Sequence, residues 1–355
     1  MLPTDRDVAH VILDDLRLLQ TMMDDNHHQP SIYKPSKCWL DKTKNAIKEI
    51  EHFGLSDFRG SSNSIGTSFA DNLYCDARSQ LSFGVRRPFK YILKKVFPFK
   101  QIFDAQVRLT HYHAQKLIKL RAYICLGSQR VADLMSKYTI PYSLAGGCAD
   151  FFTLNGTSYS HFYINLLDTH DQIAEEVDFT KAKSFFEIGG GFGGNLHLLI
   201  ENYPNLKKFV YLDIPPNLYV GTQYLKSFYG THVRDYQSTK NLKEITFQDN
   251  DDLEIICIAP WQIEQLKVSI DIFYNARSFV EMTPEIIKNY IRHIANLPNS
   301  DKTKILLVSY GLHNLARSLH PDLLQTYFNR KFKMMDRRVL PDGDEQIFIY
   351  ISDSR

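Results

Sequence analysis

The sequence lacks the signatures of several large protein classes. Its five cysteines are scattered along 355 residues with no CxxC pair, which argues against a disulfide scaffold and against a zinc ribbon. No apolar run approaches the roughly 20 residues that a bilayer-spanning helix needs. The charged, amphipathic beginning of the sequence is unlike a secretory signal. These absences predict a cytoplasmic protein.

An excess of charge of one sign is lacking as well. The 42 Lys+Arg nearly balance the 40 Asp+Glu, and a net charge of +2 predicts no nucleic-acid partner. One stretch, 78–100, differs because it carries basic residues and no acidic one, with apolar residues at helical spacing. It is either a basic face that docks on an anionic membrane or a glycolipid, or an ordinary helix packed on its apolar side. We favour the ordinary helix.

The residues that are present divide the sequence near residue 165. The first part, 1–165, contains apolar stripes at helical spacing in 8–22, 41–53 and 104–138, and predicts a mainly helical region for acceptor binding, a lid or oligomerisation. The second part, 166–355, alternates short apolar runs with helix-length stretches. Such runs, at 184–188, 208–214, 254–259, 271–275 and 304–310, are typical of parallel strands buried on both faces. The last two runs, 331–340 and 346–352, flank a PDGD turn and predict an antiparallel hairpin.

A glycine-rich turn, EIGGGFGG, follows the first of these strands and opens a helix. Glycines permit positive φ and leave no side chain between the backbone and a ligand, and a helix N-terminus offers unpaired N–H groups. Gly189, Gly191 and Gly194 fit the dinucleotide fingerprint. Glu187, Gly189, Gly191 and Gly193 fit the S-adenosylmethionine loop of methyltransferases equally well. A purely structural turn is the third interpretation.

Three features favour the methyl-donor loop. Glu187 is an acidic residue at the strand end, where it can bind the charged methionine part of the donor. About half of the chain precedes the motif, and the sheet ends in a hairpin. Asp213 closes the next strand, where a carboxylate can accept hydrogen bonds from both ribose hydroxyls.

The segment that begins at FFEIGGGFGG resembles the core of a family of bacterial sugar O-methyltransferases. Those enzymes carry a similar EIGGGxGG loop, an acidic strand end followed by proline, here Asp213-Ile214-Pro215, and a Ser-Phe-x-Glu-Met stretch, here 278–282. The resemblance covers about residues 155–355. It implies an α/β class I methyltransferase fold, with a Rossmann-like sheet and S-adenosylmethionine as cofactor. It also implies methyl transfer to a sugar hydroxyl in surface glycan or glycoconjugate biosynthesis.

The same resemblance implies the cofactor-binding residues. They are Glu187, Gly189, Gly190, Gly191, Phe192, Gly193, Asp213, Ile214, Pro260, Trp261 and Asn275. The sequence departs from the pattern at Ala259-Pro260-Trp261, where methyltransferases commonly have acidic or polar side chains. Trp261 is therefore either an adenine neighbour or a core or lid residue.

An alcohol is a weak nucleophile, so methyl transfer to it calls for a base at the carboxyl ends of the strands. Glu281 is our first candidate, with helix capping as its alternative role; His313 and His161 follow, as loop or lid histidines. For the acceptor we expect Tyr159, Tyr163 and Arg277, although a surface salt bridge is the more common role of such an arginine. No metal site is expected, because His111 and His113 lie on different faces of a helix.

Aromatic residues make up 13% of the chain, and several cluster just before the glycine loop. Rings that pack on the C–H faces of a sugar would suit a lid over a methyl-donor site. Other functions remain open at this stage: a methyltransferase of a non-sugar metabolite, an NAD-dependent oxidoreductase, or a catalytically silent scaffold. The long apolar helical faces fit a homo-oligomer and packing within one chain equally well.

Overall fold

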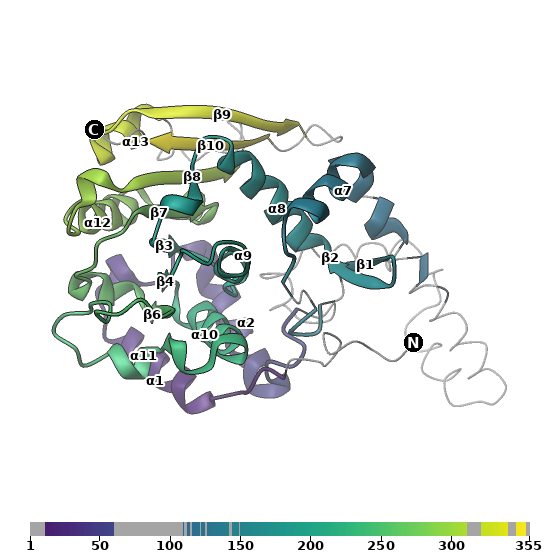
Figure 1. Ribbon diagram of the computed structural model, residues 1–355. Coiled ribbons are helices and arrows are strands. Elements are labelled where there is room, and N and C mark those ends of the chain that lie inside the picture. The colour runs from purple at the N-terminus through teal and green to yellow at the C-terminus, as the bar shows by residue number, and fades with distance from the viewer. Residues whose placement is uncertain are drawn as a thin grey trace, which may run out of the picture. The chain divides into compact units, whose positions relative to one another are not determined.

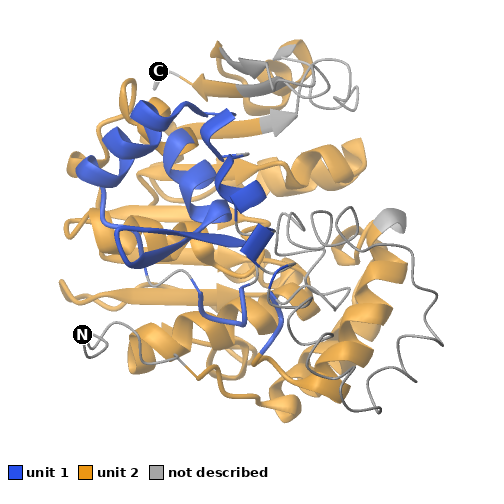
Figure 2. Cartoon of the chain, turned by 90° about the vertical axis from the view of Figure 1, so that its right-hand side faces the viewer, with its two compact units in different colours: residues 1–9, 57–168 blue, residues 10–56, 169–355 orange. Residues whose placement is uncertain are grey.

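The computed structural model describes residues 11–59, 109, 112–113, 116–120, 122–124, 126–141, 144–148, 150–310, 321–339 and 346–352. The basic stretch 78–100, His111 and His313 lie outside them. The chain forms two compact units, 1–9 with 57–168 and 10–56 with 169–355, which we call unit 1 and unit 2 (Figure 2). No helix among the described residues is long and apolar enough to cross a membrane.

Unit 2 is built on one sheet with the strand order β5-β6-β4-β3-β7-β8-β10-β9 (Figure 1). Its strands are β3 Ser184–Ile188, β4 Lys208–Leu212, β5 Val233–Arg234, β6 Glu254–Ile258, β7 Ile272–Ala276, β8 Lys304–Tyr310, β9 Phe332–Val339 and β10 Gln346–Ser352. Neighbours from β5 to β8 pair in parallel, and β10 pairs antiparallel with both β8 and β9. The predicted parallel sheet with a C-terminal hairpin is confirmed, and β5 is an unpredicted addition.

The central strands are mostly apolar, as expected of strands that helices cover on both faces of the sheet. Every residue of β3 and β6 is buried. The covering helices include α9 Gly194–Asn202, α10 Pro215–Tyr229 and α12 Pro284–Ala295. Helix α9 connects β3 to β4, and α10 follows β4 on the way to β5 and β6, so both helices lead toward one side edge of the sheet. Helix α12 connects β7 to β8, toward the other side edge. Because such crossovers are right-handed, α12 lies on the face of the sheet opposite to α9 and α10 (Figure 1).

The first described helices also belong to unit 2. They are α1 Leu16–His27, the 3₁₀ turn η2 Ser31–Tyr33 and α2 Lys37–Phe53. Tyr219 Oη in α10 accepts a hydrogen bond from the Asp15 amide at 2.8 Å, and Tyr236 Oη donates to Asp25 Oδ2 at 2.8 Å. The structure thus differs from the predicted division at residue 165, because polar contacts attach 10–56 to helices that follow the strands.

Unit 1 contains α7 Ser128–Lys137 and the hairpin of β1 Phe151–Leu154 with β2 Thr157–Ser160, and α8 His161–Ala174 begins in it. Ile118, Val131, Phe152 and Ile164 form a buried apolar cluster. The hairpin was not predicted within the mainly helical region. Its turn, Asn155-Gly156, has positive φ at both residues, which is the conformation that a two-residue hairpin turn requires.

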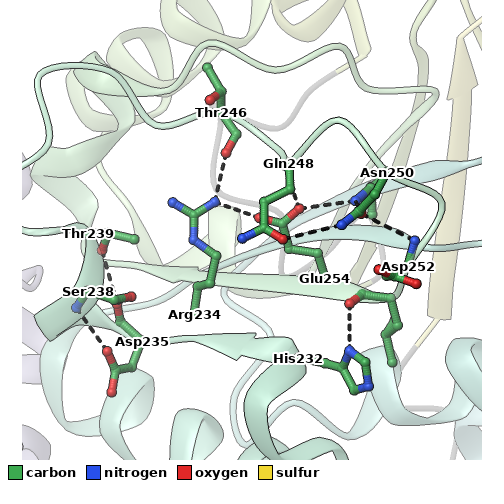
Figure 3. A network of polar contacts seen from close by, with 12 residues as sticks. His232, Arg234, Asp235, Ser238, Thr239, Thr246, Gln248, Asn250, Asp252 and Glu254 are labelled. Carbon is green, nitrogen blue, oxygen red and sulfur yellow. Dashed lines mark hydrogen bonds and ion pairs between the residues drawn. The ribbon is translucent and has the colours of Figure 1, made fainter.

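The amino end of the sheet is fixed by a buried carboxylate at the start of β6 (Figure 3). Glu254 accepts hydrogen bonds from Arg234 Nη1 at 2.5 Å, Lys208 Nζ at 3.1 Å and the Gln248 amide at 2.8 Å. These partners come from β5, from β4 and from the loop before β6. The carboxylate is only 5% exposed, so it holds three segments together in a site that water hardly reaches.

We predict that Glu254→Gln lowers the free energy of unfolding by about 3 kcal/mol, because two partly buried cations lose their partner. Urea denaturation measures this difference. Glu244→Gln, at an exposed position in the same part of the chain, is the matched control and should change stability little. Equal effects of the two substitutions would contradict the prediction.

Candidate functional site

The glycine loop joins β3 to α9 and keeps the conformation that its sequence predicts. Gly189, Gly191 and Gly193 all have positive φ, at 78°, 62° and 84°. A Cβ at Gly189 would also lie 2.3 Å from Ser278 Cβ, so no larger residue fits there. The backbone of 189–191 is partly exposed, and it is therefore accessible to a ligand at the carboxyl edge of the sheet.

Glu187 lies beneath this loop at the end of β3 and is 3% exposed. Its Oε1 accepts a hydrogen bond from Asn195 Nδ2 of α9 at 3.1 Å. Its Oε2 is buried and has no hydrogen-bond partner among the described residues. A buried carboxylate oxygen without a donor is costly, and it marks a place where a ligand with a positive charge or an N–H group would be stabilised.

Asp213 follows β4 and reaches the same loop. Its Oδ2 accepts a hydrogen bond from the Gly191 amide at 2.9 Å, and its Oδ1 accepts one from the Ile214 amide at 2.7 Å. The Asn217 side chain is a third hydrogen-bond partner, and a carboxylate has about four acceptor sites, so acceptor capacity is left for a ligand hydroxyl. Tyr211, two residues before Asp213, donates its hydroxyl to the Gly191 carbonyl, so residues in and just after β4 bind both the amide and the carbonyl of Gly191.

Glu187 and Asp213 are both buried, and burial disfavours the charged form of a carboxylate. Burial raises the pKa of Glu187 to about 8, with a smaller contribution from the nearby charge of Asp213. Burial also raises the pKa of Asp213 to about 7, against its two backbone hydrogen bonds, and Glu281 adds to the rise. Neither carboxylate forms an ion pair with a described residue. Among the described residues, the site therefore brings acidic groups together without a cation paired to them.

Asn275 at the end of β7 connects β3 to the turn that follows β7. Its Nδ2 donates to the Ile188 carbonyl at 2.9 Å, and its Oδ1 accepts from the Phe279 amide at 3.2 Å. Arg277 is exposed and adopts a left-handed backbone at φ 65°, which costs a non-glycine residue about 1 kcal/mol. Its amide donates to the Val308 carbonyl of β8 at 2.6 Å. This turn therefore brings β3, β7 and β8 together at one edge.

Glu281 ends the 3₁₀ turn η6 Ser278–Glu281 and is partly exposed. Thr283, rather than Glu281, occupies the N-cap position of α12. The Glu281 carboxylate accepts a hydrogen bond from Trp39 Nε1 in the first turn of α2 at 2.5 Å. Ser278, in the same turn as Glu281, lies directly against Gly189, so η6 packs against the glycine loop. Sequence reasoning missed Trp39, because no local pattern connects residues 242 positions apart.

Other predicted cofactor residues are more deeply packed. Phe192 is 2% exposed, and its ring lies edge-on to Tyr224 with 5.0 Å between centroids. Trp261 is 8% exposed and lies edge-on to Tyr236 at 5.8 Å, in the 3₁₀ turn η5 Pro260–Gln265 that follows β6. This packing favours the core interpretation of Trp261. Ile214 is the N-cap of α10 beside Asp213.

Three predicted residues belong to unit 1. Tyr159 in β2 packs against Phe152, with 6.4 Å between ring centroids. Tyr163 is fully buried, with its ring 5.9 Å from the Arg59 guanidinium. His161 is 4% exposed and its Nδ1 lies 2.9 Å from Asn165 Nδ2. Their roles toward an acceptor stay predictions, and His313 lies outside the described residues.

Comparisons with known proteins give low similarities. No family model matches the chain, and no curated protein matches it. Among solved structures, the chain is similar to the mitomycin 7-O-methyltransferase MmcR at 13% identity, covering 69% of this chain and 72% of that one, with a TM-score of 0.36. It is also similar to MtNAS in complex with MTA and tNA at 15% identity, covering 91% and 100%, with a TM-score of 0.36. A third is the magnesium protoporphyrin IX methyltransferase ChlM of Synechocystis PCC 6803, at 9% identity, covering 54% and 78%, with a TM-score of 0.35.

We predict that the ligand-free protein loses stability as the pH rises through 7 to 8. Glu187, with a folded pKa of about 8, and Asp213, at about 7, bind protons more tightly in the folded protein than in the unfolded chain. Their contribution is therefore complete below their ordinary pKa values and is lost as the pH passes through the folded values. Thermal denaturation from about pH 5 to about pH 9 measures the fall in Tm.

Glu187→Gln should flatten this decline, because a neutral amide replaces the buried titrating group. Glu244→Gln, which changes an exposed carboxylate, should leave the decline as in the wild-type protein. A Glu187→Gln curve parallel to that of the wild type would contradict the assignment.

Proposed function

We propose that the chain is an S-adenosylmethionine-dependent methyltransferase whose acceptor is a sugar hydroxyl. The observation that carries the cofactor is the pair of buried carboxylates under and beside a glycine loop at the carboxyl edge of the sheet. Glu187 Oε2 lacks a donor, and Asp213 touches the Gly191 amide. The resemblance of EIGGGFGG and the following residues to the sugar O-methyltransferases supports the acceptor.

The charge of the site fits the charge of this cofactor. S-adenosylmethionine carries a sulfonium and an ammonium group, so it brings positive charge to a place where Glu187 and Asp213 have none to pair with. Glu187 would hold the ammonium group, and Asp213 would hold the ribose hydroxyls. The glycines leave the backbone open for this contact, since a Cβ at Gly190 would lie 2.9 Å from Glu187 Oε2.

The cofactor supplies an activated methyl group when it is bound, and the protein has to align and deprotonate the acceptor. Glu281 is the base that the geometry favours, because it lies at the same edge as Asp213 and is partly exposed. Asn275 and Ser278 hold the end of β3 against η6, with 2.6 Å between Asn275 Nδ2 and Ser278 Oγ. This connection fixes the distance between the loop and the base.

Calorimetry tests the proposal. We expect the protein to bind S-adenosylhomocysteine and to ignore NAD(H). Asp213→Asn should weaken the binding about 10- to 100-fold, because a charged acceptor of two hydroxyl hydrogen bonds is lost. Asp249→Asn, at an exposed position, is the control. Binding of NAD(H) without S-adenosylhomocysteine would overturn the proposed function.

The affinity for S-adenosylmethionine should rise between about pH 6 and about pH 9. A cationic ligand prefers charged carboxylates, and Glu187 and Asp213 lose their protons as the pH passes about 8 and about 7. Titration in buffers of different ionisation enthalpy should show proton release on binding at neutral pH. Binding without proton release would contradict this assignment of charge.

Glu281→Gln should keep the affinity for S-adenosylhomocysteine and lose most of the turnover, because the amide cannot take the acceptor's proton. Methyl transfer from tritiated S-adenosylmethionine to free and nucleotide-linked hexoses measures it. Undiminished transfer would move the role to His313 or His161.

A further inference from the structure

The hydrogen bond between Trp39 and Glu281 links the N-terminal segment to the turn after β7. An indole is a donor only, so Trp39 Nε1 must donate and Glu281 Oε2 must accept across their 2.5 Å. Lys42 Nζ lies 4.5 Å from the centroid of the Trp39 ring, in a cation–π contact. The indole donor is directed at the one carboxylate that the proposed function assigns as base.

Helix α2 is attached to the sheet at both of its ends. Its first turn is attached to η6, which follows β7, through the Trp39–Glu281 hydrogen bond. Just past its other end, the Leu55 amide donates to Asp14 Oδ2 at 3.2 Å, and Asp14 Oδ1 accepts from Tyr219 Oη in α10 at 3.3 Å. Because α10 follows β4, and β3 lies between β4 and β7, the two attachments of α2 flank the strand that carries the glycine loop.

The side of α2 that is turned inward carries a polar group in addition to Trp39. Thr43, one turn after Trp39, is 8% exposed, and its Oγ1 is buried with no hydrogen-bond partner among the described residues. Ala46 and Ile50 continue the buried side, whereas Asp41 and Lys44 are exposed. A helix that only covered a core would present apolar residues throughout.

We propose that Trp39 is a positioning residue for Glu281, which makes the N-terminal helix α2 part of the catalytic apparatus. This inference rests on the proposed function. The indole fixes one carboxylate oxygen and so sets the direction in which the carboxylate meets the acceptor hydroxyl. A group that moves a proton must lie within hydrogen-bond reach of it, and a carboxylate on a short turn needs such a partner to stay in place.

The chain contains only two tryptophans, Trp39 and Trp261, so nuclear magnetic resonance can observe the bond directly. The ¹⁵N-labelled protein should show two indole N–H signals, and Trp261→Phe assigns them. Glu281→Gln should move the Trp39 signal upfield and leave that of Trp261 in place. Saturating S-adenosylhomocysteine should also move the Trp39 signal. A Trp39 signal that responds to neither change would overturn the proposal.

Transfer kinetics provide the second readout. Trp39→Phe keeps a ring but removes the donor, and it should lower kcat about tenfold while KM for S-adenosylmethionine and the affinity for S-adenosylhomocysteine change less than about twofold. In the Glu281→Gln background, Trp39→Phe should add nothing. Leu40→Ala, at the next and exposed position of α2, is the control. Equal losses from Trp39→Phe with and without Glu281 would overturn the proposal.

The outcomes separate this inference from the proposed function. If the wild-type protein binds no S-adenosylhomocysteine, the proposed function fails, whatever the Trp39 signal does. If it binds S-adenosylhomocysteine but transfers methyl to no hexose, the sugar acceptor fails, and the two indole signals decide the role of Trp39. If binding and transfer are normal and Trp39→Phe is as active as the wild type, only the role of Trp39 fails.

Discussion

The contact between Asp213 and the Gly191 amide is the constraint on which the site depends. It connects the end of β4 to the loop that follows β3, at 2.9 Å, and so joins two neighbouring strands beyond their last paired residues. Gly191 has a left-handed φ of 62°, which glycine adopts without steric strain. The Tyr211 hydroxyl donates a second hydrogen bond, to the carbonyl of the same glycine. The loop is thereby preorganised before any ligand arrives.

This arrangement has an electrostatic cost, because it buries two carboxylates side by side. Glu187 and Asp213 are both buried, and each raises the free energy of the other's charge. The protein offsets only part of this cost, because the donors that reach the two carboxylates are neutral: the Asn195 and Asn217 side chains and two backbone amides. A cationic ligand would offset the cost of burying the two carboxylates, and this gain would add to its affinity for the site. The network around Glu254, at the other edge of the sheet, shows the contrasting solution, in which cations of the chain itself surround the carboxylate.

Much of the fold could be predicted from the sequence, because the strands of unit 2 are short apolar runs buried on both faces. The runs at 184–188 and 304–310 match β3 and β8 at both ends. The site residues on the loop could also be predicted, because glycines and strand-end carboxylates form a local pattern. β5 was missed because two residues make no pattern. The hairpin of β1 and β2 was missed although Asn155-Gly156 is a strong turn signal, because the surrounding periodicity was interpreted as helical.

The partner of Glu281 could not be predicted in this way. Trp39 contacts it only through the tertiary fold, and the same holds for Asp15 with Tyr219 and for Tyr33 with Glu264, pairs that are 204 and 231 positions apart. These separations have a consequence for folding on the ribosome. Helices α1 and α2 are synthesised before the surfaces that receive them, which carry Tyr219 and Glu281, so their apolar sides must wait for those segments. Helices α1 and α2 are therefore made early but dock late.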